Sequence, residues 1–386
     1  MWRYACALII VTVLACSSAR AQSLCATSAS PKTVAIHLPG HPFEPVFSPN
    51  GCTVFVSLGA LGQIAVLDWR GKTYRLRRMV RVGGEPTGMV LSRDGATLFA
   101  ADPRNGDVIE INTRALASGQ GTPVRARLAP GQLRGAIYVN VTPNGRDLLV
   151  SDESALSVAV LDLRTQRLLG FIPTGRAPIA LTFSNNGRWL FLTSEIAARA
   201  WHWPLTCKPE RDAGRAGPRT LAAGAIQVAD MRLVATNPAR AVVSTVPAGC
   251  SPVRLVLSPD GATAYVTART DDAVLAFSTA KLIAKDPHPE LGSVRTGIAP
   301  VGVAATPDGR WVLVADSNRF SRSGHGALDA IPTFAFASAH QPPRRTLPTG
   351  AFPRELRFSP NGKLLAVTNA FSGTVEFINL AKALPH

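Results

Sequence analysis

The chain is poor in lysine, in aromatic residues and in long apolar runs. Only seven of its 41 basic residues are lysine, aromatic residues make up 6%, and the formal charge is +16 over 386 residues. The arginine excess is scattered, with RLRR at 75–78 as its longest run, whereas nucleic-acid binding requires a clustered basic stripe. No nucleic-acid partner is therefore expected. With 46% hydrophobic and 17% charged residues, the chain is also too apolar to be disordered.

Motifs for bound metals, haem or nucleotides are missing as well. The sequence has no CxxC, no CxxCH and no zinc-type Cys/His spacing, and it has no GxSxG elbow or Walker loop. It therefore indicates no haem or zinc cofactor, and its histidines build no arguable catalytic triad. After the N-terminus no segment reaches the roughly 18 apolar residues that span a bilayer, so no transmembrane segment is expected.

Residues 1–21 have the pattern of an export signal. Arg3 precedes an apolar stretch at 5–16, and Ala-Arg-Ala at 19–21 provides a small-x-small cleavage site. We expect a periplasmic or secreted protein with an N-terminal extension at 22–32, and a lipid-anchored form through Cys16 is the alternative. Four cysteines then remain, which in an oxidising compartment predicts two disulfides.

A turn tetrapeptide recurs seven times and divides the chain into units of about 50 residues. Asn-Gly or Asp-Gly supplies the positive φ values of a tight hairpin, and apolar strand-like segments flank every copy. The copies lie at 48–51, 92–95, 142–145, 184–187, 258–261, 306–309 and 359–362. In six units a marker proline lies nine residues before the turn glycine. These prolines are Pro42, Pro86, Pro178, Pro252, Pro300 and Pro353, and the third unit has Ala136 instead.

The repeat predicts an all-β fold, a seven-bladed β-propeller of four-stranded antiparallel blades. A parallel solenoid is the rival, but its coils are shorter and need no hairpins. The last unit lacks an outer strand, and an orphan strand at 33–38 precedes the first unit. Pairing of 33–38 with 374–380 would close the ring and leave no open edge. One domain therefore spans 33–386, with an insertion at about 197–224 between the second and third strands of unit four.

The second strands carry a family resemblance. They read Tyr265-Val266-Thr267, Ala366-Val367-Thr368-Asn369 and Phe191-Leu192-Thr193-Ser194. Together with the Pro-Asp-Gly turns, these segments resemble the YVTN-family β-propeller repeat over residues 33–386. Such propellers are similar in fold to bacterial lactonases, including 6-phosphogluconolactonase-like proteins, and to surface-layer repeat proteins. The resemblance implies the fold and leaves the activity open, because propellers carry unrelated functions.

Two sets of positions are expected to share one face of the ring near its axis. One set ends the second strands, and the other lies two residues after each marker proline. From these sets and their neighbours, the candidate ligand-face residues are Glu44, Asp102, Asp152, Glu195, Arg254, Arg269, Asp316, Arg319, Arg354, Glu355 and Asn369. Glu44 and Glu355 lie on neighbouring blades, where they could hold a divalent cation or act as an acid/base pair. Alternatively, the strand-end acids cap turns and each Glu pairs with an Arg.

The repeat frame also predicts how the cysteines pair. Cys207 in the insertion and Cys250 in the crossover to unit five lie on one face of the ring. Cys52 follows the first turn, and Cys25 precedes the closing strand on the opposite face. Mixed pairs would have to cross the ring, beyond the Cα separation of about 7 Å that a disulfide tolerates. We therefore expect Cys207–Cys250 and Cys25–Cys52.

Two functions of different class stay open. The first is a noncatalytic exported scaffold, a monomer that recognises a protein, a glycan or a small molecule on the charged channel face. The second is a lactonase-type hydrolase, metal-dependent if Glu44, Glu355, Asp316 and Asn369 converge near the axis. Scattered, Arg-paired side chains would favour the scaffold. Two tryptophans in the insertion suggest either an aromatic flap over the channel or a structural flap packed on the blade rim.

Overall fold

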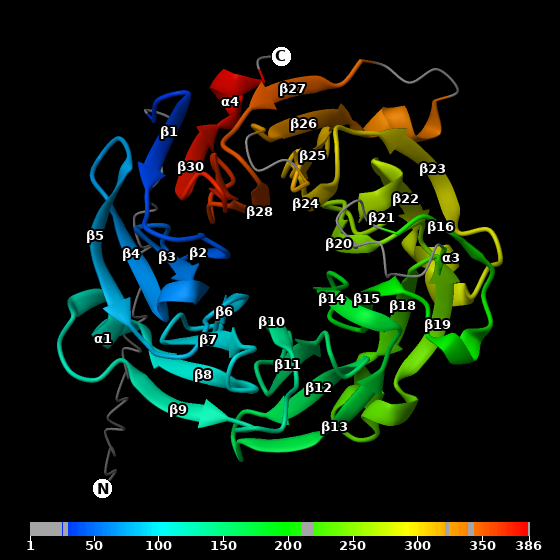
Figure 1. The fold of residues 1–386 in the computed structure, drawn as a ribbon, viewed down its shortest axis with the longest axis horizontal. Helices are drawn as coiled ribbons and strands as arrows, with labels where there is room; N and C mark the ends of the chain where they lie inside the picture. The colour runs from blue at the N-terminus through cyan, green and yellow to red at the C-terminus, as the bar shows by residue number, and fades with distance from the viewer. Residues whose placement is uncertain (1–24, 26–29, 210–219, 321–323, 339–342, 385–386) are drawn as a thin grey trace, which may run out of the picture.

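The chain forms a ring of seven four-stranded antiparallel blades around a central axis (Figure 1). This computed structural model describes residues 25, 30–209, 220–320, 324–338 and 343–384. The predicted export signal at 1–21 lies outside the described residues, as does most of the predicted extension at 22–32. The ring confirms the all-β fold class and the number of blades predicted from the repeat.

The first four blades follow the turn repeat in chain order, each from its inner strand to its outer strand. Blade 1 has β2 (Pro45–Phe47), β3 (Thr53–Leu58), β4 (Gln63–Trp69) and β5 (Tyr74–Arg81), and blade 2 has β6 (Met89–Leu91), β7 (Thr97–Asp102), β8 (Asp107–Asn112) and β9 (Val124–Leu128). Blade 3 has β10 (Ala136–Val141), β11 (Asp147–Asp152), β12 (Ser157–Asp162) and β13 (Arg167–Pro173), and blade 4 has β14 (Arg176–Phe183), β15 (Trp189–Ile196), β18 (Ala225–Asp230) and β19 (Val242–Pro247).

The last three blades repeat this order, except that the final outer strand comes from the N-terminus. Blade 5 has β20 (Pro252–Leu257), β21 (Thr263–Ala268), β22 (Ala273–Ser278) and β23 (Glu290–Arg295), and blade 6 has β24 (Pro300–Ala305), β25 (Trp311–Asp316), β26 (Ala327–Pro332) and β27 (Arg345–Pro348). Blade 7 has β28 (Pro353–Phe358), β29 (Leu364–Asn369), β30 (Thr374–Asn379) and β1 (Thr33–His37).

Short helices connect the strands. The α-helices are α1 (Thr113–Ser118), α2 (Met231–Val234), α3 (Thr279–Ala284) and α4 (Leu380–Ala383), and the 3-10 turns are η1 (Gly59–Leu61), η2 (Arg199–Trp201), η3 (Pro238–Arg240), η4 (Arg269–Asp271) and η5 (Thr333–Ala337). Helix α2 begins at Met231, directly after β18 ends at Asp230. The reason is that the Asp230 side chain caps this helix by accepting a hydrogen bond from the Arg232 amide at 2.8 Å. Within the described residues, no helix is long and apolar enough to cross a membrane.

The seven turns between first and second strands are built alike. Their glycines have φ angles between 67° and 75°, a region that favours glycine. The Asn or Asp before each glycine does not have a positive φ. Its side chain instead accepts hydrogen bonds, as Asn50 does from the Ser48 hydroxyl and the Cys52 amide. The expectation of positive φ values therefore holds for the glycine alone, because these side-chain bonds fix the preceding residue in another conformation.

Strand β1 closes the ring as predicted. It pairs antiparallel with β30, with Thr33 opposite Ile378 and His37 opposite Thr374. Where blade 7 meets blade 1, the rings of Tyr74 and Phe377 lie 4.4 Å apart in a shared apolar core. The N-terminal and C-terminal parts of the chain therefore lie side by side in one blade (Figure 1).

A buried hydroxyl near the end of the second strand joins each of five blades to the next. In blade 5, Thr267 Oγ1 accepts a hydrogen bond from Arg254 N at 3.1 Å and donates one to Val301 O of blade 6 at 2.9 Å. Equivalent hydroxyls donate to the next inner strand at 2.6–2.9 Å. We call this set the hydroxyl clasps. It comprises Ser57, Ser151, Thr193, Thr267 and Thr368, all fully buried.

Two blades lack the clasp hydroxyl, and each has a glycine in its own innermost segment. Ala101 and Ala315 occupy the clasp position in blades 2 and 6, where the inner strands carry Gly88 and Gly302. A Cβ at either glycine would lie 2.7 or 2.6 Å from a carbonyl oxygen of the next inner strand. In blade 2 two neighbouring donors make the contact instead, because Gly88 N donates to Ile137 O at 2.9 Å and the Thr87 hydroxyl donates to the same oxygen at 3.0 Å.

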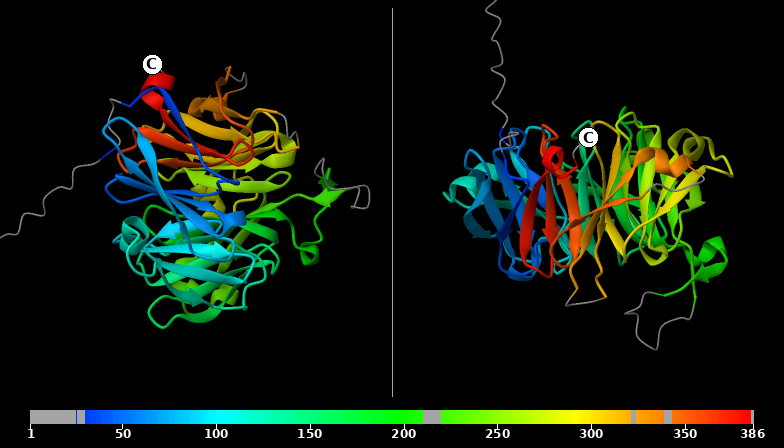
Figure 2. Two further views of the ribbon diagram at one scale, coloured as in Figure 1. Left: turned by 60° about the vertical axis from the view of Figure 1, so that its left-hand side comes forward. Right: turned by 90° about the horizontal axis from the view of Figure 1, so that it is seen from above.

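Two disulfides fasten the ring on opposite faces. The crossover face is the one where outer strands pass to the next blade, and the turn face carries the seven turns. The described parts of the insertion, 197–209 and 220–224, project from the crossover face (Figure 2) and contain the hairpin of β16 (Leu205–Cys207) and β17 (Leu221–Ala222). Cys207–Cys250 ties this hairpin to the crossover into blade 5, and Cys25–Cys52 ties the N-terminal segment to the first turn. These are the pairs that the repeat frame predicts.

Thr267→Val is expected to lower the free energy of unfolding by about 1–3 kcal/mol. Valine keeps the shape of threonine but leaves Arg254 N and Val301 O without a partner in the core. Urea unfolding measures the loss. The matched control is Thr245→Val on β19, where the hydroxyl makes no hydrogen bond in the described structure. Equal stability of the two variants would contradict the role assigned to the clasps.

Deletion of residues 22–38 should lower the melting temperature of the whole ring in one transition. It removes β1 and leaves the edge of β30 unpaired. Because it also removes Cys25, the reference is the mature chain carrying Cys25→Ser and Cys52→Ser, which keeps β1 without the disulfide. Differential scanning calorimetry compares the two, and identical melting would rule out closure through β1 as a source of stability.

Candidate ligand-binding site on the propeller axis

A β-bulge at the start of the inner strands directs two successive side chains to the axis. In β20, Pro252 pairs with Ala268 and Leu255 with Val266, so three steps on one strand match two on the other. The same kind of irregularity follows the marker residue in β10, β14, β24 and β28. Residues one and two positions after the marker, such as Val253 and Arg254, therefore line one cavity instead of alternating between faces.

The residues directly after the markers form a ring that we call the axial collar. Five of its seven members are apolar, and several pack together in one buried cluster. The collar consists of Phe43, Thr87, Ile137, Ile179, Val253, Val301 and Arg354. Arg354 is its single charged member. Sequence reasoning missed the collar because it considered only the position two residues after each marker.

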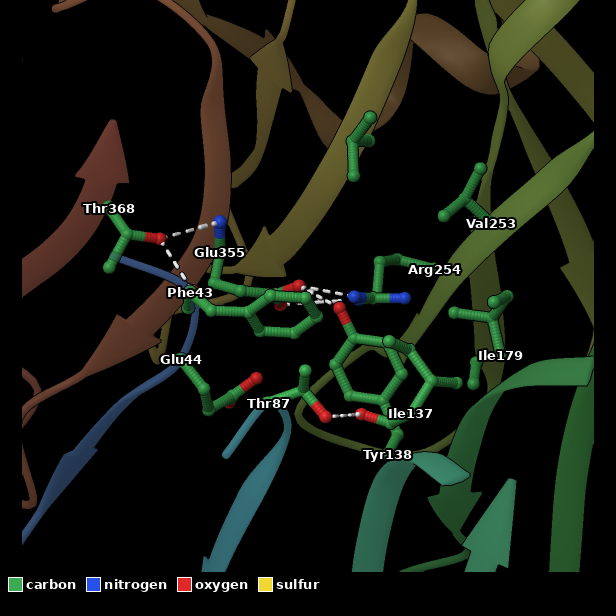
Figure 3. A network of polar contacts seen from close by, with 12 residues as sticks. Phe43, Glu44, Thr87, Ile137, Tyr138, Ile179, Val253, Arg254, Glu355 and Thr368 are labelled. Atoms are coloured by element: carbon green, nitrogen blue, oxygen red, sulfur yellow. Dashed lines mark hydrogen bonds and ion pairs between the residues drawn. The ribbon is translucent and has the colours of Figure 1, made fainter. Parts of the chain in front are cut away.

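An ion pair spans the axis beside the collar (Figure 3). Arg254 Nη2 pairs with Glu355 Oε1, and Arg254 Nε donates to Glu355 Oε2 at 3.2 Å. The Tyr138 hydroxyl donates to Glu355 Oε1 at 2.6 Å, and its ring lies 3.8 Å below the Arg254 guanidinium. All three residues are buried. Tyr138 was not among the sequence-based candidates because unit three has Ala136 in place of the marker proline.

Glu44 is buried next to this pair but has a different partner. Its Oε1 lies 2.6 Å from Arg357 Nη2, although within the described residues neither oxygen accepts a well-oriented hydrogen bond. Burial raises the pKa of Glu44 to about 7, with a further increase from the charge of Glu355, while Arg357 and Arg254 oppose the shift. Glu44 is thus the carboxyl of the axis that can change its charge near neutral pH.

Two cavities meet at the axial ion pair. The crossover-face chamber has a volume of about 570 Å³ and the turn-face chamber about 550 Å³. Tyr138 and Arg254 line both, so these side chains form the wall between them. Most residues that line the turn-face chamber are apolar, among them Phe47, Leu181 and Val256.

Five of the eleven candidate residues line the crossover-face chamber. Together with Glu153 they supply its charged lining, and Glu355 lies beside the lining through its ion pair with Arg254. The charged lining residues are Arg254, Arg269, Arg319, Arg354, Glu153 and Glu195. Glu195 holds Arg269 with two hydrogen bonds of 2.9 and 2.7 Å. Glu44, the remaining candidate of the axis, contacts the chamber only through its neighbours.

Arg354 is the distinctive cation of this chamber. Its guanidinium lies 3.7 Å from the centre of the Phe43 ring and 5.7 Å from that of Phe352. Within the described residues it has no ion-pair partner, and its Nε lacks a hydrogen bond. Arg254 Nη1 lacks one as well, and Figure 3 shows a guanidinium nitrogen that points away from Glu355. Burial lowers the pKa of both arginines. Unsatisfied donors on buried cations favour an anionic ligand.

Four further candidates lie away from the axis and outside the chamber lining, and three of them hold the loops of their own blades. Asp102 accepts hydrogen bonds from Glu85 N at 2.9 Å and from Arg127 Nη1 at 2.8 Å. Asp152 accepts one from Arg134 N at 2.8 Å. Asn369 Nδ2 donates to Thr374 Oγ1 at 3.0 Å. These contacts correspond to the turn-capping alternative stated for strand-end residues.

Asp316, the fourth of these residues, lies beside a second carboxyl in blade 6. It is buried, and burial together with the charge of Asp329 raises its pKa well above the ordinary value. Asp329 is bound by Thr346 Oγ1 at 2.7 Å and by Arg344 Nε at 2.6 Å. Asp316 and Asn369 therefore do not converge with Glu44 and Glu355 on the axis.

No metal centre emerges from these side chains. Among the described residues, no three His, Cys, Asp or Glu side chains are grouped so that they could hold a metal ion. Glu355 and Glu44 face Arg254 and Arg357 instead, and an arginine occupies the place that a cation would take. The arrangement corresponds to the Arg-paired alternative for the channel mouth.

The insertion reaches the rim of the crossover-face chamber. Leu221 of β17 lines the chamber. Trp201 and Trp203 are half-buried and pack against one another, with ring centres 5.2 Å apart. A separate cleft of about 320 Å³ separates the insertion from the end of β15, and Trp203 lines it. The insertion thus combines a self-packed aromatic pair with one direct contact to the chamber.

The ring and its axial site define a seven-bladed β-propeller. Residues 225–383 match the family model described as "Lactonase, 7-bladed beta-propeller". The chain is accordingly a lactonase-like seven-bladed β-propeller. The matched part contains Arg254, Arg354 and Glu355, whereas Glu44 and Tyr138 lie outside it.

Solved structures of other proteins share the fold. One titled "Kuenenia stuttgartiensis Hydrazine Synthase" is 18% identical, with a TM-score of 0.64 over 90% of this chain and 97% of that chain. Another, titled "Crystal Structure of Mitotic Checkpoint Complex", is 12% identical, with a TM-score of 0.64 over 97% of this chain and 99% of that chain. At these identities the likeness shows the fold alone. A search of curated proteins gives no match.

Glu44→Gln is expected to flatten the dependence of stability on pH. Because the pKa of Glu44 rises from an ordinary 4.5 to about 7 on folding, the folded state retains a proton that the unfolded chain releases. The bound proton stabilises the folded state fully below pH 4.5, and this stabilisation is lost as the pH rises through 7. Relative to the variant, the wild type should lose about 1–3 kcal/mol over this range. Urea unfolding at several pH values measures the difference.

Glu153→Gln is the matched control for this experiment, since it removes an exposed carboxyl of the same region. Its stability curve should run parallel to that of the wild type. If the curve of Glu44→Gln runs parallel too, Glu44 does not carry the proton.

Proposed function

We propose that the protein is an exported binding scaffold that recognises a small anionic molecule in the crossover-face chamber. The observation that carries this proposal is Arg354, a cation that stacks on the Phe43 ring and lies near the Phe352 ring, with no ion-pair partner among the described residues. Arg254 lines the same chamber, and its buried Nη1 has no hydrogen-bond partner in the described residues. Its volume of about 570 Å³ suits a small ligand.

The other charges of the chamber support binding rather than catalysis. Arg269 is held by Glu195 and Arg254 by Glu355. These buried pairs fix both cations in place and engage the carboxylates of Glu195 and Glu355. A preorganised cation costs little to orient when an anion binds.

The proposal includes export to an oxidising compartment, either the periplasm or the medium. The two disulfides support it, since such bonds persist where thiols are not kept reduced. The pattern of an export signal at 1–21 supports it as well. Protein and glycan partners remain alternatives, and the cleft beside Trp203 is the surface that would favour a glycan.

A lactonase-type hydrolase is the second candidate, favoured by the family match over 225–383. In that function Glu44 would be the residue to act as a base, since its pKa of about 7 suits proton transfer. Hydrolysis of gluconolactone or 6-phosphogluconolactone in a pH-stat, lost in Glu44→Gln, would support it. Turnover no faster than the uncatalysed reaction would favour the scaffold.

Arg354→Met should weaken the binding of benzoate and gluconate by about tenfold or more, because it removes a charged donor from the chamber. Isothermal titration calorimetry on the oxidised protein measures the affinity. Arg345→Met is the control, since Arg345 also stacks on an aromatic ring, at 5.2 Å from Trp311, but outside the chamber. The proposal fails if neither anion binds the wild type, or if both variants lose affinity alike.

A further inference from the structure

We propose that the ligand is an amphipathic monocarboxylate, with its carboxylate at Arg354 and its apolar body on the axial collar. The inference rests on the proposed anion-binding function and names the chemical class that the chamber selects. It follows from two features of the lining. One is the balance of its charges, and the other is the apolar character of its floor, which the collar residues form.

The charge balance favours a single negative charge. Arg254, Arg269, Arg319 and Arg354 line the chamber, and three carboxylates face them, Glu153 and Glu195 in the lining and Glu355 beside it. Glu355 and Glu195 pair with Arg254 and Arg269, whereas Arg354 has no ion-pair partner in the described residues. The arginines therefore exceed the carboxylates by one charge, which a single carboxylate ligand balances and a phosphate dianion exceeds.

The floor favours an apolar body. Next to Arg354, the chamber is lined by the collar side chains Ile137, Ile179, Val253 and Val301, and by Phe352. Four of these belong to the buried apolar cluster around the axis, with Ile137 packed against it. A polyhydroxylated acid would lose its water there without gaining hydrogen-bond partners. An alkyl or aryl group would instead be transferred from water to an apolar surface.

The geometry also positions the carboxylate. The Arg354 guanidinium is held against Phe43 at 3.7 Å, and Arg254 is fixed by Glu355 and by the ring of Tyr138. Each has a nitrogen without a hydrogen-bond partner. Arg254 is 8% exposed, and both arginines line the chamber. A guanidinium group offers the planar fork of donors that carboxylates prefer.

A chain-length series tests the class on the unmodified protein. Isothermal titration with acetate, butyrate and hexanoate should show affinity rising by about fourfold for each added methylene that is buried. Hexanamide, which lacks the charge, and gluconate, which lacks the apolar body, should bind at least tenfold more weakly than hexanoate. Affinities that do not depend on chain length, or a preference for gluconate, would overturn the proposed class and leave the anion-binding function standing.

Two variants of β20 locate the apolar body. Val253→Ala, in the collar, should weaken hexanoate several-fold and leave acetate unchanged. Val256→Ala removes the same two methyl groups from the turn-face chamber and should leave both ligands unchanged. If Val256→Ala weakens hexanoate instead, the ligand occupies the other chamber and the proposal is wrong. If no carboxylate binds the wild type at all, the anion-binding function itself fails.

Discussion

The contact between neighbouring inner strands is the constraint on which the whole arrangement depends. An inner strand has a sheet partner on one side only, so the carbonyls on its other side need donors from the next blade. The hydroxyl clasps supply them, through Thr193, Thr267, Thr368 and their serine counterparts. Since the five clasps hold the backbone of five of the seven collar residues, the positions of most side chains on the axis follow from these hydrogen bonds.

The axis itself is organised by the need to satisfy buried charge. A buried ion pair has a large desolvation cost unless its remaining hydrogen-bonding groups find partners. Glu355 meets that condition through Arg254 and the Tyr138 hydroxyl. Glu44 faces only Arg357, and burial raises its pKa to about 7. The same side chains separate two cavities of different character, one rich in charge and one largely apolar.

The repeat was sufficient to predict the blades, the closing strand and the disulfide pairs, because periodic turns fix where each strand lies. It also brought Glu44, Arg254 and Glu355 to the axis, since equivalent positions of a ring meet there. It could not reveal the β-bulge that turns two successive side chains inward, so the collar was missed. Nor did it separate Asp102 and Asp152, which bind their own loops, from residues such as Arg354 that line the chamber, because this difference depends on side-chain direction.

The closing strand imposes an order on folding. Strand β1 is made first, but its partner β30 lies more than 300 residues later in the chain, so blade 7 is the last to be completed. The Cys25–Cys52 bond shortens this search, because it fastens the segment before β1 to the first turn of blade 1, which adjoins blade 7. Strand β1 then stays close to the position where it pairs with β30, and the conformational entropy lost when the ring closes is reduced. The loop closed by the Cys25–Cys52 disulfide thus assists the assembly of the entire ring.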